Sequence, residues 1–396
     1  MISDKMKGFV ANSSAIRAMF EEGKKLAAQY GADKVYDFSL GNPNIPAPPA
    51  VKDAILEILD KEDPVLVHGY MNNSGYDDVR DTLAAHLNAL YGTDYGKDNI
   101  VMTVGAAGGL NVILKSILNP GDEVLTVKPY FGEYRSYVGN FDGVLVEAAT
   151  DPETFYPDIR DMEAKLSART RAVILNTPNN PTGVIYPESS LKEVAALLKR
   201  KSEEFGAPIY LISDEPYREI AYDGAEVPWI PSLYRDTIVG YSYSKTLSLP
   251  GERIGFLVIP SGLADFADVI AAANVANRIL GFVNAPSLMQ RVAARCCDAR
   301  ADVAYYDRNR TLLYESLTRF GYTCVKPEGA FYLWVKSPEE DERAFCAKCK
   351  EEERILIVPG RSFGCAGFVR IAYCVAYQTI ENALPGFERV AKSYGL

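Results

Sequence analysis

Two residues that can do chemistry stand where apolar, strand-like runs of the sequence end. Lys245 follows "TIVGYSY" and Asp214 follows "PIYLIS", while Arg253 comes eight residues after the lysine. Ligands of parallel α/β sheets bind at the carboxyl ends of the strands, so we expect these side chains to share one site. Most lysines are surface residues, and acids after strands often cap helices. The neighbouring residues must therefore show whether Lys245 and Asp214 belong to a functional site.

Three further stretches supply groups that suit the same site. Tyr217 lies three residues after Asp214, and Asn180 belongs to "NTPNNPTGVIY", a rigid turn that fixes an amide in place. The stretch "TVGAAGGL" passes from a strand into small residues at a helix start, where backbone N–H groups can approach a phosphate. Each stretch alone has an ordinary structural explanation, as a tight turn or a common helix start.

An arginine in the C-terminal part completes the set. Arg370 lies within the apolar run "GFVRIAY", where it needs a fixed anion such as a carboxylate, or a structural ion pair. One ligand would use a reactive lysine, an aspartate facing a ring nitrogen, hydrogen-bond donors for a phenolic oxygen, and a phosphate site. That ligand is pyridoxal 5'-phosphate (PLP).

The elements around these residues predict an α/β protein. Between about residues 99 and 260, short β-rich runs such as "NIVMTV", "EVLTV" and "RAVILN" alternate with helical stretches. This pattern predicts a large domain whose mostly parallel sheet is covered by helices. The N-terminal helix and the shorter strands after Pro286 indicate a smaller α+β domain built from both termini. We place the large domain at 46–290 and the small one at 1–45 and 291–396.

Bulk properties exclude several classes of function. The 396 residues carry a net charge of −10, which does not suit binding to nucleic acid or anionic lipid. The absence of an apolar leader or a long apolar run predicts a cytoplasmic protein. Only two histidines are present, which disfavours histidine-based catalysis and a metal site at Cys346 and Cys349, the one CxxC pair.

Taken together, the motifs resemble those of a known family. The chain is similar to fold-type I, PLP-dependent aminotransferases of class I/II, in particular those related to aspartate aminotransferase. The similarity rests on eight motifs that occur in the family's order and cover about residues 40 to 375: "SLGNP", "YMNNSGYDDVR", "TVGAAGGL", "KPYFGEY", "NTPNNPTG", "SDEPY", "SYSKTLSLPGERIG" and "FVRIAY". No single motif is specific, but the combination is.

This resemblance implies an activity and a role for each site residue. The activity would be ping-pong exchange of an amino group between an L-amino acid and a 2-oxo acid. Lys245 would form the Schiff base and move the substrate's α-proton, and Asp214 would keep the pyridinium nitrogen protonated. Tyr217 and Asn180 would bond the phenolic oxygen. The phosphate would be held by Gly105, Ala106, Ala107, Ser242 and Arg253. The substrate's α-carboxylate would be held by Arg370 beside Gly41, and Asn180 would also contact the substrate.

Two implied contacts are less definite. An aromatic ring of "PYFGEY" would stack on the cofactor, with Phe131 as the match and Tyr130 as its rival. Tyr70 would reach the phosphate of a neighbouring subunit, so the active unit would be a homodimer. Many relatives carry a hydroxyl or lysine where this chain has Ala106 and Ala107, and many carry tryptophan or tyrosine at Phe131. Neither departure indicates which substrate the protein takes.

Alternatives remain at this stage. The same frame supports a C–S β-lyase, an amino-acid decarboxylase or a racemase, because these share the lysine, the aspartate and the ring. A PLP-sensing regulator without catalysis would need a basic N-terminal extension, whereas the match begins within the first fifteen residues. Side-chain specificity would depend on residues around Ser13 and Ser14, on Lys128 and Tyr134, and on the 275–284 loop, where Arg278 is either a ligand for a dicarboxylate or a solvated surface residue.

Overall fold

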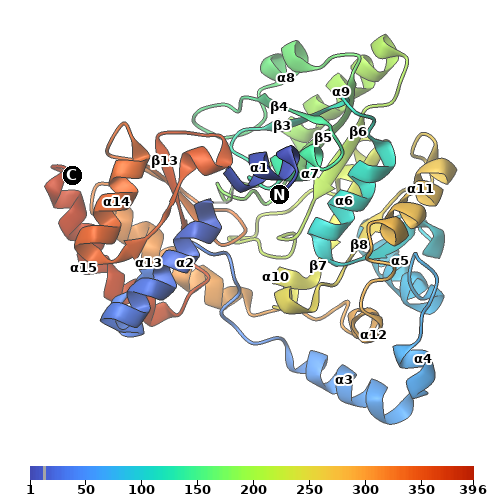
Figure 1. Cartoon of the computed structure of the whole chain (residues 1–396), viewed down its shortest axis with the longest axis horizontal. Coiled ribbons are helices and arrows are strands. Elements are labelled where there is room, and N and C mark those ends of the chain that lie inside the picture. Colours follow the sequence, from blue (N-terminus) through green and yellow to red (C-terminus); the bar gives the residue numbers. More distant parts are fainter. Residues whose placement is uncertain (12–14) are drawn as a thin grey trace.

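The computed structural model describes residues 1–11 and 15–396 and shows a larger and a smaller body side by side (Figure 1). Its helices are α1 (Asp4–Ala11), α2 (Ala15–Tyr30), α3 (Pro49–Lys61), α4 (Pro64–His68), α5 (Asp77–Tyr91), α6 (Gly105–Ile117), α7 (Tyr134–Gly139), α8 (Ile159–Lys165), α9 (Glu188–Phe205), α10 (Tyr243–Thr246), α11 (Phe266–Ile279), α12 (Ser287–Arg295), α13 (Val303–Arg319), α14 (Glu342–Glu353) and α15 (Tyr377–Ser393). None of the described helices is long and apolar enough to cross a membrane.

A seven-stranded sheet forms the centre of the larger body, in the order β2-β8-β7-β6-β5-β3-β4. The strands are β2 (Ile100–Thr103), β3 (Glu123–Val127), β4 (Val144–Ala148), β5 (Thr170–Asn176), β6 (Tyr210–Asp214), β7 (Thr237–Ser242) and β8 (Gly255–Val258). Only β8 runs against the others. The link from β7 to β8 holds only the four-residue α10 and one 3₁₀ turn, without the longer helix that usually carries a chain back to a parallel strand. The predicted mostly parallel sheet is confirmed.

Both faces of this sheet are buried, as its unpatterned apolar strands predict. Within β5, Val173 and Leu175 pack with side chains of α8 and α9, whereas Ala172 and Ile174 pack with α6, α7 and α11 on the other face. The alternation follows the two-residue period of a strand. Because both faces are packed, the sheet is rigid and holds the side chains at its carboxyl edge in fixed positions.

The smaller body joins the two ends of the chain. Its antiparallel sheet has the order β12-β13-β10-β9, with β9 (Cys324–Val325), β10 (Tyr332–Lys336), β12 (Val358–Pro359) and β13 (Phe368–Ala372). A parallel pair, β1 (Tyr36–Asp37) with β11 (Ile355–Leu356), ties the N-terminal segment to it. One of the shorter strands expected after Pro286 was the run "RILIVPG". It is instead two short strands in two different sheets.

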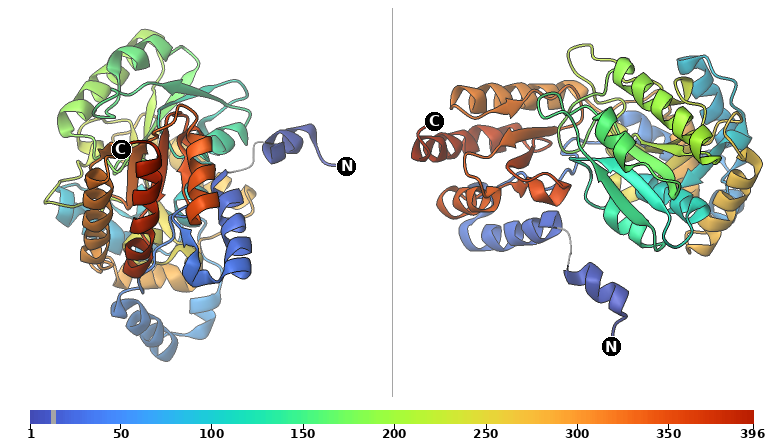
Figure 2. Two further views of the ribbon diagram at one scale, coloured as in Figure 1. Left: turned by 90° about the vertical axis from the view of Figure 1, so that its left-hand side faces the viewer. Right: turned by 90° about the horizontal axis from the view of Figure 1, so that it is seen from above.

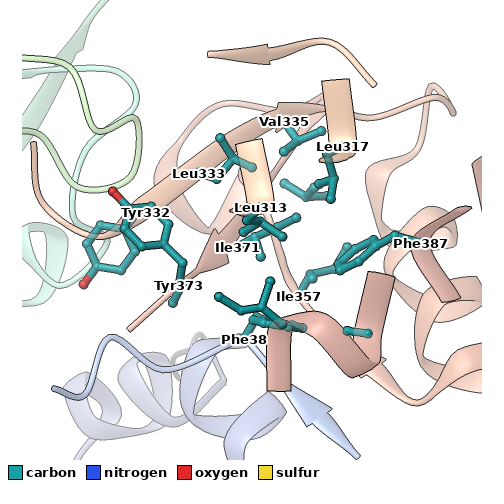
Figure 3. Close-up of a cluster of buried hydrophobic side chains, with 14 of the residues drawn as sticks. Phe38, Leu313, Leu317, Tyr332, Leu333, Val335, Ile357, Ile371, Tyr373 and Phe387 are labelled. Atoms are coloured by element: carbon teal, nitrogen blue, oxygen red, sulfur yellow. The ribbon is translucent and has the colours of Figure 1, made fainter. Parts of the chain in front are cut away.

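The core of the small body lies between its sheet and the long helices α13, α14 and α15. Phe38, Leu313, Ile371 and Phe387 are all fully or almost fully buried in it (Figure 3). Cys346 and Cys349, the CxxC pair, face the same core. Because Phe38 comes from the N-terminal segment, the core itself depends on both ends of the chain.

The division at 46–290 stays a prediction. Its C-terminal limit falls within α12, where Val292, Ala293 and Cys296 pack with the α3 and α5 side of the large core. We therefore propose to assign all of α12 to the large domain. Helix α1 stands away from the small body, and Lys5 Nζ lies 2.9 Å from an Asp142 carboxylate oxygen of the large one (Figure 2).

Candidate active site

A cavity of about 260 Å³ brings most of the candidate residues together. It opens where the carboxyl edge of the large sheet faces the small domain's β13. The predicted residues in its wall are Gly41, Ala106, Ala107, Phe131, Asn180, Asp214, Tyr217, Ser242, Lys245, Arg253 and Arg370. Residues up to 329 positions apart in the chain thus meet at one place.

Asp214, the last residue of β6, forms one end of the cavity. Its Oδ2 accepts a hydrogen bond from Tyr134 Oη at 2.6 Å, while its buried Oδ1 has no partner among the residues that the structure describes. Burial raises the pKa of this carboxyl to about 7, and the Tyr134 hydrogen bond opposes the rise. A buried carboxylate oxygen without a donor suits a protonated ring nitrogen.

Asn176 fixes the backbone beside the aspartate and was missed in the sequence. It ends β5, its Nδ2 donates to the Asp214 carbonyl at 2.8 Å, and its Oδ1 accepts the Asn180 N–H at 2.7 Å. Its place at a strand end next to β6 was a signal that could have found it. The side chain ties the turn that carries Asn180 to the strand that carries Asp214.

Arg370 and Asn180 orient each other at the other side of the cavity. Arg370 Nη1 donates to Asn180 Oδ1 at 3.0 Å and Nη2 donates to the Ser39 carbonyl at 2.5 Å. Because a guanidinium only donates, the amide oxygen must face it, which leaves Asn180 Nδ2 free to donate. Arg370 is 2% exposed, and its Nε has no acceptor in the described parts of the chain.

Lys245 lies in the four-residue α10 that follows β7. Its Nζ donates to the Gly41 carbonyl at 2.6 Å and lies 5.4 Å from the Phe331 ring centroid. Burial, with added repulsion from the Arg370 and Arg253 cations, lowers the pKa of the amine to about 8, although the Cys374 thiol opposes this. About a tenth of the amine is therefore neutral at pH 7 and able to accept a proton, and this fraction grows as the pH rises toward 8.

A third part of the cavity wall carries groups that can bind an anion. Ala106 and Ala107 lie in the first turn of α6, whose N–H groups have no partner within the helix. Ser242, Ser244 and Arg253 face the same space. Gly105 lies just behind, with a φ of +75° that favours glycine, and a Cβ there would lie 2.8 Å from Arg253 Nη2 and displace that guanidinium.

The structure separates the two aromatic candidates. Phe131 lies in the cavity wall, whereas the Tyr130 hydroxyl donates to Glu147 Oε1 at 2.6 Å and the ring is 2% exposed. The geometry therefore favours Phe131 as the ring that would face a bound cofactor.

Several other sequence candidates lie elsewhere. Tyr70 is 92% exposed and stands outside the cavity of the single chain, and Arg278 is exposed at the end of α11. Tyr134, expected near the distal pocket, lies behind Asp214 instead. Lys128 lies against Gly364 of the small domain. Ser13 and Ser14 fall outside the described residues.

Tyr332 was missed, and its strand "GAFYLWV" offered no signal beyond alternation. It lines the cavity from β10, and its Oη lies 2.7 Å from Tyr217 Oη. Its hydroxyl packs so closely on Gly41 that a Cβ there would collide with it, which explains the glycine of "SLGNP".

The residues of the cavity fit PLP. A buried carboxylate with one unpartnered oxygen stands at one end, an arginine and a helix N-terminus stand at another, and a partly neutral lysine amine lies in the same wall. These are the complements of a ring nitrogen, a phosphate and an aldehyde.

Comparison with known proteins agrees with this geometry. The family model "Aminotransferase class I and II" matches residues 33–387. The chain is 30% identical to aromatic-amino-acid aminotransferase 2 of Thermococcus litoralis, over 99% of this chain and 98% of the relative. It is 31% identical to the aspartate/prephenate aminotransferase of Thermus thermophilus, over 88% and 89%.

Solved structures give the same answer. An amino transferase of Eubacterium rectale is 46% identical, with a TM-score of 0.96 over the whole of both chains. Aspartate aminotransferase of Thermus thermophilus with maleate is 28% identical, with a TM-score of 0.87 over 98% of this chain and 99% of that one. Family model, relatives and folds coincide over nearly the full length, and the chain is an aminotransferase that belongs to the class I and II family.

Proposed function

We propose that this aminotransferase works with PLP and exchanges the amino group of an L-amino acid with a 2-oxo acid. The observation that carries the proposal is the buried, unpaired Asp214 Oδ1 in the same cavity as the Lys245 amine and the Arg370 guanidinium. The β-lyase and decarboxylase alternatives would use the same ring-binding groups, but the relatives named above are all aminotransferases.

In this proposal each residue has a separate task. Lys245 would hold the cofactor covalently, Arg253, Ser242 and the start of α6 would bind its phosphate, and Asn180 and Tyr217 would donate to its phenolic oxygen. The cofactor supplies an electron sink for the negative charge that develops at the substrate's α-carbon. The freed Lys245 Nζ would then take the α-proton, because its lowered pKa leaves a neutral amine available.

The direct test is chemical labelling. The purified protein is expected to be yellow, and borohydride should fix the chromophore permanently on one lysine. Peptide mapping should find the label on Lys245, since this amine is buried in the cavity and partly neutral. A label on another lysine, or a colourless protein that gains no absorbance with added PLP, would refute the proposal.

Arg370 would bind the α-carboxylate that all amino acids share. A planar guanidinium forms two parallel charge-assisted bonds, which an ammonium group cannot copy. Besides Lys245 and Arg253, it is the cation that the cavity wall contributes. A substrate with a carboxylate in its side chain would need a further cation, and Arg278 of a neighbouring subunit is the candidate.

Two variants separate these roles. Arg370→Lys is expected to lower kcat/KM for every amino donor by a similar factor. Arg278→Ala is expected to spare alanine and aromatic donors and to lose about 2–5 kcal/mol on aspartate or glutamate, the range for truncating one partner of a buried charge pair. Equal losses for aspartate and for an uncharged donor in Arg278→Ala would remove this residue from the substrate pocket.

The proposed active unit is a homodimer in which Tyr70 reaches the neighbouring site. Support comes from a group of exposed apolar side chains near Tyr70: Leu56 and Leu59 on α3, with Val65 and Leu66 on α4. Exposed apolar side chains grouped in this way are typical of a surface that another protein covers.

Mixed dimers test this arrangement. Tyr70→Ala and Lys245→Ala variants are each expected to be impaired, but their hybrid would hold one site with both native residues. An equal mixture after subunit exchange should therefore recover about a quarter of wild-type activity, because half of the dimers are hybrids with one intact site of two. Activity that stays at the sum of the two parents would show that Tyr70 serves its own subunit.

A further inference from the structure

Tyr332 and Tyr217 form a pair of buried phenols in the cavity wall. Tyr332 lies on β10 of the small domain and Tyr217 follows β6 of the large domain, and their hydroxyl oxygens are 2.7 Å apart. Within residues 1–11 and 15–396 this pair has no further hydrogen-bond partner. Burial raises the pKa of both hydroxyls, that of Tyr332 to about 12, so both keep their protons at neutral pH.

The direction of the hydrogen bond follows from counting protons. Two hydroxyls hold two protons, and only one proton can lie between the oxygens. Tyr332 Oη packs against the Cα of Gly41, which offers no acceptor on that side, and among the described residues its only hydrogen-bond partner is Tyr217. We therefore assign the Tyr332 hydroxyl as the donor and the Tyr217 oxygen as the acceptor. This leaves the Tyr217 proton free for an acceptor in the cavity.

The Tyr332 ring has a second contact. The guanidinium carbon of Arg370 lies 4.4 Å from its centroid, and Phe363 lies 4.8 Å from the same carbon. Cations near aromatic faces are attracted to them, more strongly when water is excluded. One side chain thus touches both the arginine proposed for the substrate's carboxylate and the phenol proposed for the cofactor's oxygen.

We propose that Tyr332 is a positioning residue: its hydroxyl aims and strengthens the Tyr217 hydroxyl as a donor, and its ring supports Arg370. The inference rests on the proposed function, since both partners take their tasks from it. A hydroxyl that accepts a hydrogen bond becomes a better donor itself, so loss of the Tyr332 proton should weaken Tyr217 without removing it. Loss of the ring should instead loosen substrate binding.

The first test is an absorbance titration of the PLP-loaded protein. A donor to the phenolic oxygen favours its anion, so a weaker donor should raise the titration midpoint of the bound chromophore. Tyr332→Phe is expected to shift the midpoint upward by about 0.5 pH unit or more, at nearly unchanged KM for the amino donor. Tyr332→Leu, which also removes the ring, is expected to raise KM by roughly tenfold.

The matched control is a second buried phenol pair in the same core. Tyr373 Oη lies 3.4 Å from the Tyr222 hydroxyl oxygen and 3.3 Å from the Ala330 carbonyl oxygen, and Figure 3 shows Tyr373 beside Tyr332 at one edge of the cluster. Tyr373→Phe removes a hydroxyl of similar burial and should leave the midpoint at its wild-type value. A shift in this control equal to that of Tyr332→Phe would mean that any buried hydroxyl of this core has the effect, and would overturn the proposal.

A double variant shows whether Tyr332 acts through Tyr217. In a Tyr217→Phe background, adding Tyr332→Phe should produce no further shift, because the intermediary is gone. If Tyr332→Phe alone cannot be purified, the titration midpoint of Tyr332→Leu serves in its place, because that variant also lacks the hydroxyl. A further shift in the double variant, or an unshifted midpoint in Tyr332→Phe, would overturn the proposal, whereas a wild-type protein that binds no PLP would refute the proposed function instead.

Discussion

Lys245→Ala is expected to lower kcat for transamination by about 10²–10⁴-fold or more, the range for loss of a positioned acid–base group, while the protein still takes up PLP. Arg253, Ser242, the start of α6 and Asp214 remain in place, so non-covalent contacts with the cofactor persist. What disappears is the one amine that the described residues place in the cavity wall, and with it the group that would move the α-proton.

Lys245→Arg is the informative comparison. It keeps a positive charge, but a guanidinium does not lose its proton in a protein and cannot act as a base. It should therefore be as inactive as the alanine variant. In the wild type, the pKa of about 8 predicts that the free protein's reaction with PLP accelerates as the pH rises through 8, because the neutral fraction of the amine grows.

Lys115→Ala, which changes an exposed lysine in the last turn of α6, is the control for loss of a lysine as such. Single-turnover spectra with an amino donor give the rate of the proton-transfer step, and dialysis measures how firmly PLP is held. Normal turnover in Lys245→Ala would contradict the assignment, and so would an active Lys245→Arg.

Features set by local chain chemistry could be predicted from the sequence. Strand ends followed by polar residues placed Asp214 and Lys245 at one sheet edge, because parallel strands share their carboxyl edge. Small residues at the start of α6 and the turn at Asn180 followed from backbone geometry. The mostly parallel sheet followed from its continuous apolar strands.

Features set by contacts between distant segments could not be predicted. Tyr134 was expected at the distal pocket, yet it bonds to Asp214, which lies 80 residues further along the chain. Whether a tyrosine at the start of a short helix faces the cavity or the sheet depends on the packing of α7, which no local pattern specifies. Tyr332 was missed because alternation in β10 gives two faces, and the sequence does not say which face meets another domain.

The antiparallel β8 and the split of "RILIVPG" have the same origin. Both depend on which strands become neighbours, and hydrophobic patterns record burial without recording partners. The positions of Tyr70 and Arg278 depend on a second subunit, so neither the sequence nor the single chain tests their roles.

Asp214→Asn is expected to lower kcat by roughly 10²–10⁴-fold, corresponding to about 3–5 kcal/mol for breaking a buried charge pair. A neutral amide cannot keep a ring nitrogen protonated, so the cost should fall on the chemical step and not on binding of the phosphate. Asp214→Glu keeps the charge and should be far less impaired. Equal activity of the Asn and Glu variants would contradict the role of this carboxylate.

In the PLP-free protein, Asp214→Asn should be favourable: at alkaline pH it should increase the free energy of unfolding. Burial raises the folded-state pKa of Asp214 from 3.8 to about 7, so between these values the folded protein binds more protons than the unfolded chain. Its contribution to the free energy of unfolding therefore falls as the pH rises from 4 to 7, by at most about 4 kcal/mol. Asp214→Asn has no carboxyl to ionise and escapes this loss.

Thermal unfolding of the PLP-free proteins at pH 5 and pH 8 measures this difference. At pH 5 the Asp214 carboxyl is mostly protonated, so wild type and Asp214→Asn should unfold at similar temperatures. At pH 8 the variant should be the more stable of the two, and adding PLP should reverse the order, because a protonated ring nitrogen pairs with the wild-type carboxylate. If the wild type were the more stable protein at pH 8 without PLP, the carboxylate would already have a partner in the chain, and the cavity would not be built around a missing cation.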